Sequence, residues 1–154
     1  MKKLICVIMA LCMTGALAAC GTSGAGSSPN EPSTSAEVSG KEVKIEYGSS
    51  DIYSQKDIDE AIDVIQKEFS TWKGCELHSI RYDTDECNSK KNIKWMNSLK
   101  KGQNYTECIK FLADFHSPVE GYGAWEPDTE YADYQWWLAR SEGGNWELLT
   151  WGFG

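Results

Sequence analysis

The chain has 154 residues, of which 23 are acidic and 15 basic, so its net charge at pH 7 is −8. An acidic surface is repelled by nucleic-acid phosphates and by anionic lipid headgroups, and beyond the N-terminus adjacent lysines occur only at Lys90-Lys91 and Lys100-Lys101. We therefore expect no nucleic-acid partner.

The N-terminus has the pattern of a bacterial export signal. Lys2 and Lys3 precede an apolar stretch, Leu4 to Leu17, that is too short to span a bilayer. The stretch ends in Leu17-Ala18-Ala19-Cys20, which resembles the lipobox of bacterial lipoproteins. The resemblance implies cleavage before Cys20 and attachment of a diacylglycerol to its sulfur. The expected location is then the extracytoplasmic face of the cell membrane, with the protein held there by its lipid. The alternative is an ordinary secretory signal followed by a chance cysteine.

The segment after the cysteine is predicted to be a flexible linker. In residues 21–40, 14 of 20 positions are Gly, Ser, Thr or Pro, a composition that cannot bury a core. We therefore expect a signal peptide over residues 1–19, a lipidated cysteine and linker over residues 20–40, and a single domain over residues 41–154. Loss of the two signal lysines leaves 15 − 2 = 13 basic residues, and a mature charge of 13 − 23 = −10.

The first part of the domain predicts a strand, a helix and a second strand. Residues 41–47 alternate apolar and charged side chains, as in a half-buried strand. Ser54 is a suitable N-cap for a helix that carries apolar residues at spacings of three and four and ends at Gly74. Residues 75–82 then predict a second strand, and we expect the helix to pack on the sheet.

The second part of the domain predicts a short helix followed by three strands. The helix begins at Asn88 or Ser89. Residues 105–115 predict the longest strand, with apolar side chains mostly on one face. Residues 131–140 and 146–153 predict a β-hairpin.

Aromatic residues in the hairpin and in the loop before it are candidates for ligand binding. The hairpin carries tryptophan on both faces, whereas a two-layer domain buries one face of its sheet, so we expect most rings to be structural and one or two to be left for a ligand. The alternative is that every tryptophan packs in the core or at its rim. Long loops that carry aromatic residues are often functional, as in residues 116–130. The expected ligand-binding residues are Tyr122, Trp125, Trp137 and His116.

These elements predict an α+β fold in which a helix packs on a curved antiparallel sheet that ends in a β-hairpin. The architecture resembles the cystatin-like and nuclear-transport-factor-2-like folds. The stretches GCELHSIRYDTDE, DFHSP, GYGAWEPDTEYADYQWWLAR and GNWELLTWGFG resemble small lipoproteins of Gram-positive, clostridia-like bacteria. This second resemblance covers residues 75–154 and the lipobox, and it implies no catalytic residues.

The sequence offers little catalytic chemistry. Its two histidines are His78 and His116, and Asp114 shares a predicted strand face with His116, which would permit an acid–base pair. Patterns for a phosphate loop, a serine nucleophile or a zinc site are absent from the sequence, so we expect no cofactor and no metal.

The favoured function is a lipid-anchored, non-enzymatic binding or assembly module for an unknown protein or small ligand. Two alternatives remain. One is a binder of carbohydrate or cell-wall fragments that uses exposed aromatic rings, and the other is a small hydrolase or isomerase that uses Asp114 and His116.

Three cysteines remain in the domain, so at most one intramolecular disulfide can form. The favoured pair is Cys75 with Cys87, which would close a loop of about a dozen residues and stabilise the fold by about 3 kcal/mol. The alternative is that these two and Cys108 are all reduced.

Overall fold

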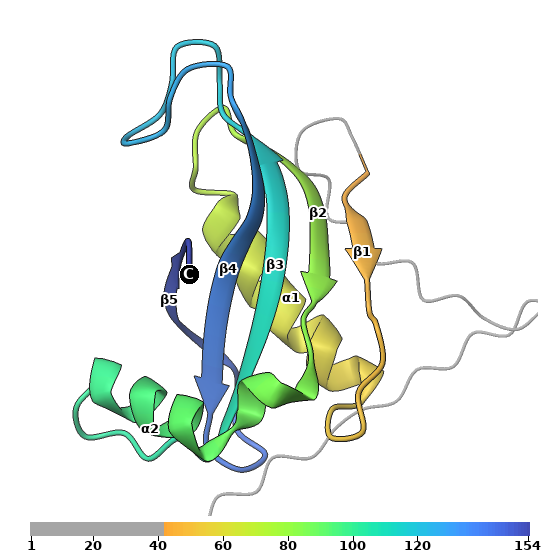
Figure 1. Cartoon of the computed structure of the whole chain (residues 1–154), viewed down its shortest axis with the longest axis vertical. Coiled ribbons are helices and arrows are strands. Elements are labelled where there is room, and N and C mark those ends of the chain that lie inside the picture. The colour runs from red at the N-terminus through yellow and green to blue at the C-terminus, as the bar shows by residue number, and fades with distance from the viewer. Residues whose placement is uncertain (1–41) are drawn as a thin grey trace, which may run out of the picture. The chain divides into compact units, whose positions relative to one another are not determined.

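The computed structural model describes residues 42–154, which form an α+β domain with a five-stranded sheet. The signal peptide, Cys20 and the linker lie outside the described residues, so the predictions made for them stay predictions. In chain order the elements are β1 (Lys44–Glu46), α1 (Gln55–Phe69), β2 (Glu76–Tyr82), the 3₁₀ turn η1 (Asp85–Asn88), α2 (Lys90–Leu99), β3 (Glu107–His116), β4 (Glu130–Arg140) and β5 (Glu147–Gly152) (Figure 1).

The strands lie in the sheet in the order in which they occur in the chain, and the sheet does not close. From β2 to β5 each strand is antiparallel to the next, whereas β1 is parallel to β2. A parallel pair needs a long crossover, and α1 supplies it between these two strands. The α+β prediction is confirmed, but the sheet is mixed, so the prediction of an antiparallel sheet is correct only for β2–β5.

The start of α1 is set by a capping box. The Ser54 hydroxyl accepts a hydrogen bond from the Asp57 N–H at 3.2 Å, and the Asp57 carboxylate accepts one from the Ser54 N–H at 2.9 Å. The apolar stripe of the helix then packs on the sheet. Its buried members are Ile58, Ala61, Ile62, Ile65 and Phe69.

The helix ends at Phe69, five residues before the predicted stop at Gly74. The hydroxyls of Ser70 and Thr71 donate to carbonyls of the preceding turn, which replaces further helical bonding. Trp72 therefore lies beyond the helix, yet it is buried and joins the same core.

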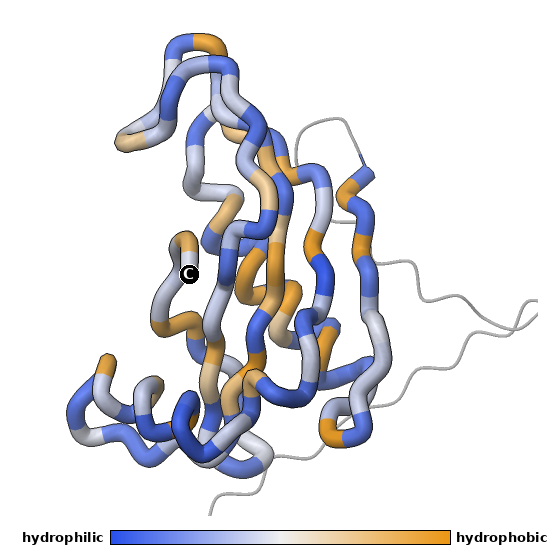
Figure 2. Tube along the Cα trace, viewed as in Figure 1, coloured by the Kyte–Doolittle hydropathy of each residue, from blue (hydrophilic) through white to orange (hydrophobic). Residues whose placement is uncertain are grey.

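Both faces of the sheet are covered at its α2 end. On the face that α1 covers, Trp136 is 0% exposed, with the Trp72 ring centroid 5.2 Å away. On the opposite face the Trp137 ring packs edge-on against Trp95 of α2 and is 9% exposed. Hydrophobic residues lie along the central strands and α1, and α2 is mostly hydrophilic (Figure 2). The expectation of a single covered face is wrong here, because α2 adds a partial third layer.

The cysteine pairing predicted from the sequence is contradicted. Cys75, Cys87 and Cys108 are all free and buried. Cys75 precedes β2 and Cys87 follows it, and a seven-residue strand separates them by roughly 20 Å, far beyond disulfide range. The Cys87 thiol instead lies beside Cys108, whose thiol donates to the Cys87 carbonyl at 2.9 Å.

We expect the free energy of unfolding to fall as the pH rises above about 9. Burial raises the pKa of Cys87 and raises that of Cys108 to about 12, where the neighbouring Cys87 adds to the effect. In the unfolded chain a thiol loses its proton near its ordinary pKa, whereas the folded protein keeps Cys108 protonated to a higher pH, so alkali favours unfolding. Between its ordinary and its raised pKa, each such thiol lowers the free energy of unfolding by about 1.4 kcal/mol per pH unit.

Urea titrations from neutral pH to about pH 11 measure this loss. In Cys108→Ala the dependence on pH should be shallower between about pH 9 and pH 10, below the range in which tyrosines ionise. An unchanged slope in that variant would show that Cys108 is not protected from ionisation by the fold.

Candidate functional site

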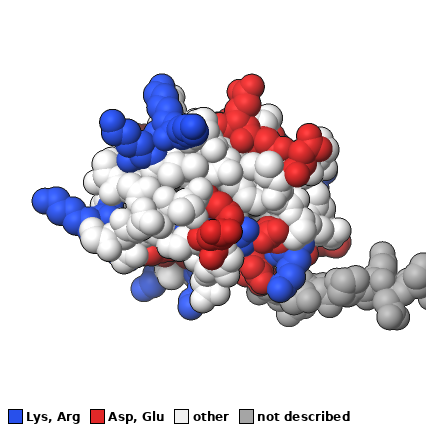
Figure 3. Space-filling model, turned by 90° about the horizontal axis from the view of Figure 1, so that it is seen from below, with Lys and Arg blue, Asp and Glu red and all other residues white. Residues whose placement is uncertain are grey.

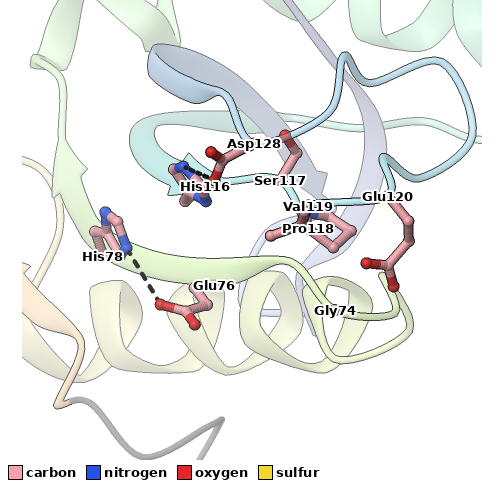
Figure 4. A pocket seen from close by; sticks show the side chains of 9 residues that line it. All are labelled: Gly74, Glu76, His78, His116, Ser117, Pro118, Val119, Glu120 and Asp128. Carbon is pink, nitrogen blue, oxygen red and sulfur yellow. Dashed lines mark ion pairs between the residues drawn. The ribbon is translucent and has the colours of Figure 1, made fainter.

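A cavity opens at the end of the sheet opposite α2, between the start of β2, the end of β3 and the loop of residues 117–129 (Figure 4). Its volume is about 490 Å³, within the range typical of sites for small ligands. It is lined by Gly74, Glu76, His78, His116, Ser117, Pro118, Val119, Glu120 and Asp128.

The loop wall of the cavity is held in place by short-range contacts. Ser117 is fully buried, and its hydroxyl accepts a hydrogen bond from the Thr129 N–H at 3.0 Å and donates to the Glu126 carbonyl. Gly74 has φ +75°, and a Cβ there would lie 3.0 Å from Pro118, so glycine allows the loop to sit against the chain before β2. Ser117 therefore organises the loop and is not placed as a nucleophile.

A β-bulge in β2 places His78 at the cavity. In the register with β3, Leu77 pairs with Phe115 and Ser79 with Asp114, so His78 is the additional residue. Bulges redirect side chains and are common beside functional sites. The His78 ring stacks on that of His116, with 6.4 Å between ring centroids and 19° between planes.

Each imidazole lies next to a carboxylate. His78 Nδ1 is 2.9 Å from Glu130 Oε1, and because an ionised carboxylate only accepts, this nitrogen carries the proton. His78 Nε2 is 3.8 Å from Glu76 and has no hydrogen-bond partner among the described residues. His116 Nε2 lies 3.5 Å from Asp128 Oδ1. The cavity lining thus combines two imidazoles with the carboxylates of Glu76, Glu120 and Asp128.

Asp114 does not pair with His116. The two share the polar face of β3, as predicted, but Asp114 accepts hydrogen bonds from the Ser79 hydroxyl at 2.8 Å and from the Asp133 N–H at 2.9 Å, and lies 3.9 Å from Arg81. Burial favours the neutral acid, yet these hydrogen bonds, Arg81 and His78 together hold the Asp114 pKa below its ordinary value. Asp114 is thus a weak base that is already hydrogen-bonded.

The predicted aromatic residues have mainly structural positions. Trp137 is buried under α2, so the structure does not support it as a ligand-binding ring. Trp125 is half-buried and packs against Phe115, with 5.2 Å between centroids, which fixes the loop to the core. Tyr122 is half-buried and pairs with Trp125 in a β-bridge. Of the four residues expected to bind a ligand, His116 alone lines the cavity.

Several cavity residues were missed by the sequence analysis, namely Glu76, His78, Glu120 and Asp128. Glu76 and His78 are two residues apart on the predicted strand, so their side chains lie on the same face. This spacing is the one feature of the sequence that could have indicated the cavity. Within residues 42–154, no group of three or more His, Cys, Asp or Glu side chains has a geometry that could hold a metal ion.

Comparison with known protein families, with curated proteins and with solved structures finds no match to this chain. Neither of the helices described in residues 42–154 is long and apolar enough to cross a membrane.

Proposed function

We propose that the protein is a lipid-anchored, extracytoplasmic, non-enzymatic binding module that takes a small ligand with a positively charged amine in the His78/His116 cavity. The observation that carries this proposal is the lining of the cavity. Three carboxylates, those of Glu76, Glu120 and Asp128, surround a 490 Å³ space beside two stacked imidazoles. Carboxylates form their strongest hydrogen bonds with cationic donors.

The lipid anchor and the extracytoplasmic location rest on the lipobox at Cys20 and the export signal before it. The relationship to cystatin-like or nuclear-transport-factor-2-like folds is likewise a proposal. It is supported by α1 packing across a sheet whose strand pairs contain bulges, since bulges bend a sheet.

The two other functions have less support from the geometry. A sugar platform needs exposed, accessible rings, whereas Trp125 and Trp137 pack on neighbouring residues. A hydrolase or isomerase with an Asp114/His116 pair needs the two to interact, whereas the hydrogen bonds of Asp114 go to Ser79 and Asp133. We therefore favour binding over catalysis.

Glucosamine and N-acetylglucosamine distinguish an amine site from a sugar site, because the same nitrogen is a cationic amine in the first sugar and a neutral amide in the second. We expect glucosamine to shift the NMR signals of the histidine rings saturably and N-acetylglucosamine to have little effect. The chain has two histidines, so both rings can be followed. Asp128→Asn should weaken glucosamine binding about tenfold, the effect of losing roughly 1.4 kcal/mol.

Asp133→Asn is the matched control. Asp128 and Asp133 both have positive φ, at 49° and 60°, a conformation that asparagine tolerates. Each variant therefore removes one negative charge without straining the backbone. Asp133 lies outside the cavity lining, and its substitution should leave binding unchanged. Equal responses to the two sugars would favour the carbohydrate binder, and no response from either histidine would exclude the cavity as an amine site.

A further inference from the structure

α2 and the turn after it carry an exposed basic surface on an acidic domain. The α2 surface is defined by six exposed residues, Lys90, Lys91, Lys94, Trp95, Leu99 and Lys101. Trp95 and Leu99 are 40% and 44% exposed, although both are apolar. The four cations and two apolar side chains of this surface thus lie within twelve residues, which also include Lys100.

Helix geometry separates Lys91 and Lys94 of this surface from the face that packs on the sheet. Met96 is fully buried and marks the inner face of α2. At 100° per residue, Lys91 and Lys94 lie on the opposite side of the helix from Met96. The Trp95 and Trp137 rings pack edge to face, with 5.1 Å between centroids, and Trp95 remains 40% exposed.

The lysines of this surface are not neutralised locally. Lys100 pairs with Glu147, and Lys110 pairs with Asp83 at 2.7 Å. None of the four lysines of the α2 surface forms an ion pair with another residue in the described part of the chain. Figure 3 looks at this end of the domain and shows Lys and Arg side chains gathered mainly on one side, and Asp and Glu side chains mainly elsewhere.

We propose that the α2 surface docks on an anionic phospholipid bilayer. Lysines around exposed Trp and Leu are the composition of helices that lie at a membrane interface, where the cations meet phosphate groups and the apolar side chains enter the headgroup region. The net negative charge does not prevent this, because at physiological salt charges more than about 8 Å away are largely screened. The local positive charge of the docking face therefore determines whether the domain binds the bilayer.

The docking rests on the lipid anchor of the proposed function, which would hold the domain near the membrane. The chain between Cys20 and Glu42 reaches up to about 70 Å when extended, enough to allow α2 to face the bilayer. The ten residues of β3 run from the α2 end of the sheet to the cavity end, about 33 Å away (Figure 1). A domain docked by α2 therefore presents the cavity away from the membrane.

Fluorescence quenching by brominated lipids tests the docking in the full-length, anchored protein. We expect vesicles that contain brominated phosphatidylglycerol to quench part of the tryptophan emission, and vesicles of brominated phosphatidylcholine alone to quench far less. Trp95→Phe should remove the lipid-dependent part. Lys91→Glu with Lys94→Glu, which changes two exposed side chains and leaves the core intact, should reduce the quenching to the phosphatidylcholine level, as should about 1 M salt.

The matched control is Lys56→Glu with Lys67→Glu on α1, which makes the same charge change on exposed positions of the opposite face and should leave quenching unchanged. Equal quenching in both lipids, or an equal effect of the α1 variant, would overturn the proposal. It would also be overturned if the α2 surface bound an acidic protein while lipid left the Trp95 fluorescence unquenched. If Cys20→Ala stays in the membrane fraction as a mature, cleaved product even in about 1 M salt, which releases the α2 surface, while quenching persists at low salt, the anchor is wrong and the docking stands.

Discussion

Trp136→Ala is expected to lower the free energy of unfolding by about 3–5 kcal/mol, the largest effect of any single ring in the domain. Trp136 is fully buried, and the rings of Phe69, Trp72 and Tyr134 lie around it with centroids within 6.5 Å. Alanine would leave a cavity between α1 and the sheet. Because small domains are stable by only about 5–15 kcal/mol, urea titration followed by circular dichroism should show a large loss of stability.

Trp151→Ala provides the control for this prediction. Trp151 is the direct cross-strand partner of Trp136 in the β4–β5 pair but is 41% exposed, so its loss should cost less, about 2 kcal/mol. Trp136→Phe should also cost much less than Trp136→Ala, because the indole Nε1 has no hydrogen-bond partner among the described residues. Equal losses at positions 136 and 151 would mean that the core does not centre on Trp136.

Arg140→Met should destabilise the domain by about 2–3 kcal/mol, because it leaves two carboxylates without their cation. Arg140 is buried, bonds Asp57 at 2.7 Å and Glu107, and lies over the Trp146 ring at 4.2 Å. It thereby joins the start of α1 to β3 and β4. Arg140→Lys should recover little, since one ammonium group cannot reproduce the planar, two-sided bonding of the guanidinium.

The loss should also depend on pH. The pKa of Asp57 is lowered first by the Ser54 hydroxyl and then by Arg140, so this contribution is present above the ordinary carboxyl pKa near 4 and disappears as the pH falls through the lowered value. Wild type and Arg140→Met should therefore converge in acid. Arg81→Met is the control, because its pair with Asp133 is exposed and should contribute at most about 1 kcal/mol. A difference between wild type and Arg140→Met that persists at low pH would assign the effect to packing on Trp146.

Local features of the sequence predicted much of the fold. The capping box at Ser54 and the apolar stripe after it involve neighbouring residues, so α1 could be placed at its start without knowledge of the rest of the chain. The hairpin of β4 and β5 is equally local. The end of α1 was misplaced because the hydroxyls of Ser70 and Thr71 compete for the last carbonyls, an effect that apolar spacing does not reveal.

The candidate site could be predicted only in part, because it depends on contacts between distant segments. Strict alternation along β2 would place His78 on the same face as the buried Ile80, and the bulge after Leu77 puts it on the other. The sequence contains no local signal for that bulge. The pairing of His78 with His116 then follows from the β2–β3 register, and the burial of Trp137 from the packing of α2.

The parallel edge strand β1 has a mechanical consequence. β1 pairs with β2 over three residues, and its Ile45 and the preceding Val43 are only half-buried, whereas β3 and β4 pair along nearly their whole length. If the proposed lipid anchor holds the chain at its N-terminus, a pull on the tether would enter the domain at β1. Three residue pairs resist shear far less than the central strands, so β1 would be the first strand to detach. The released residues would lengthen the tether, and the core and the cavity would stay folded.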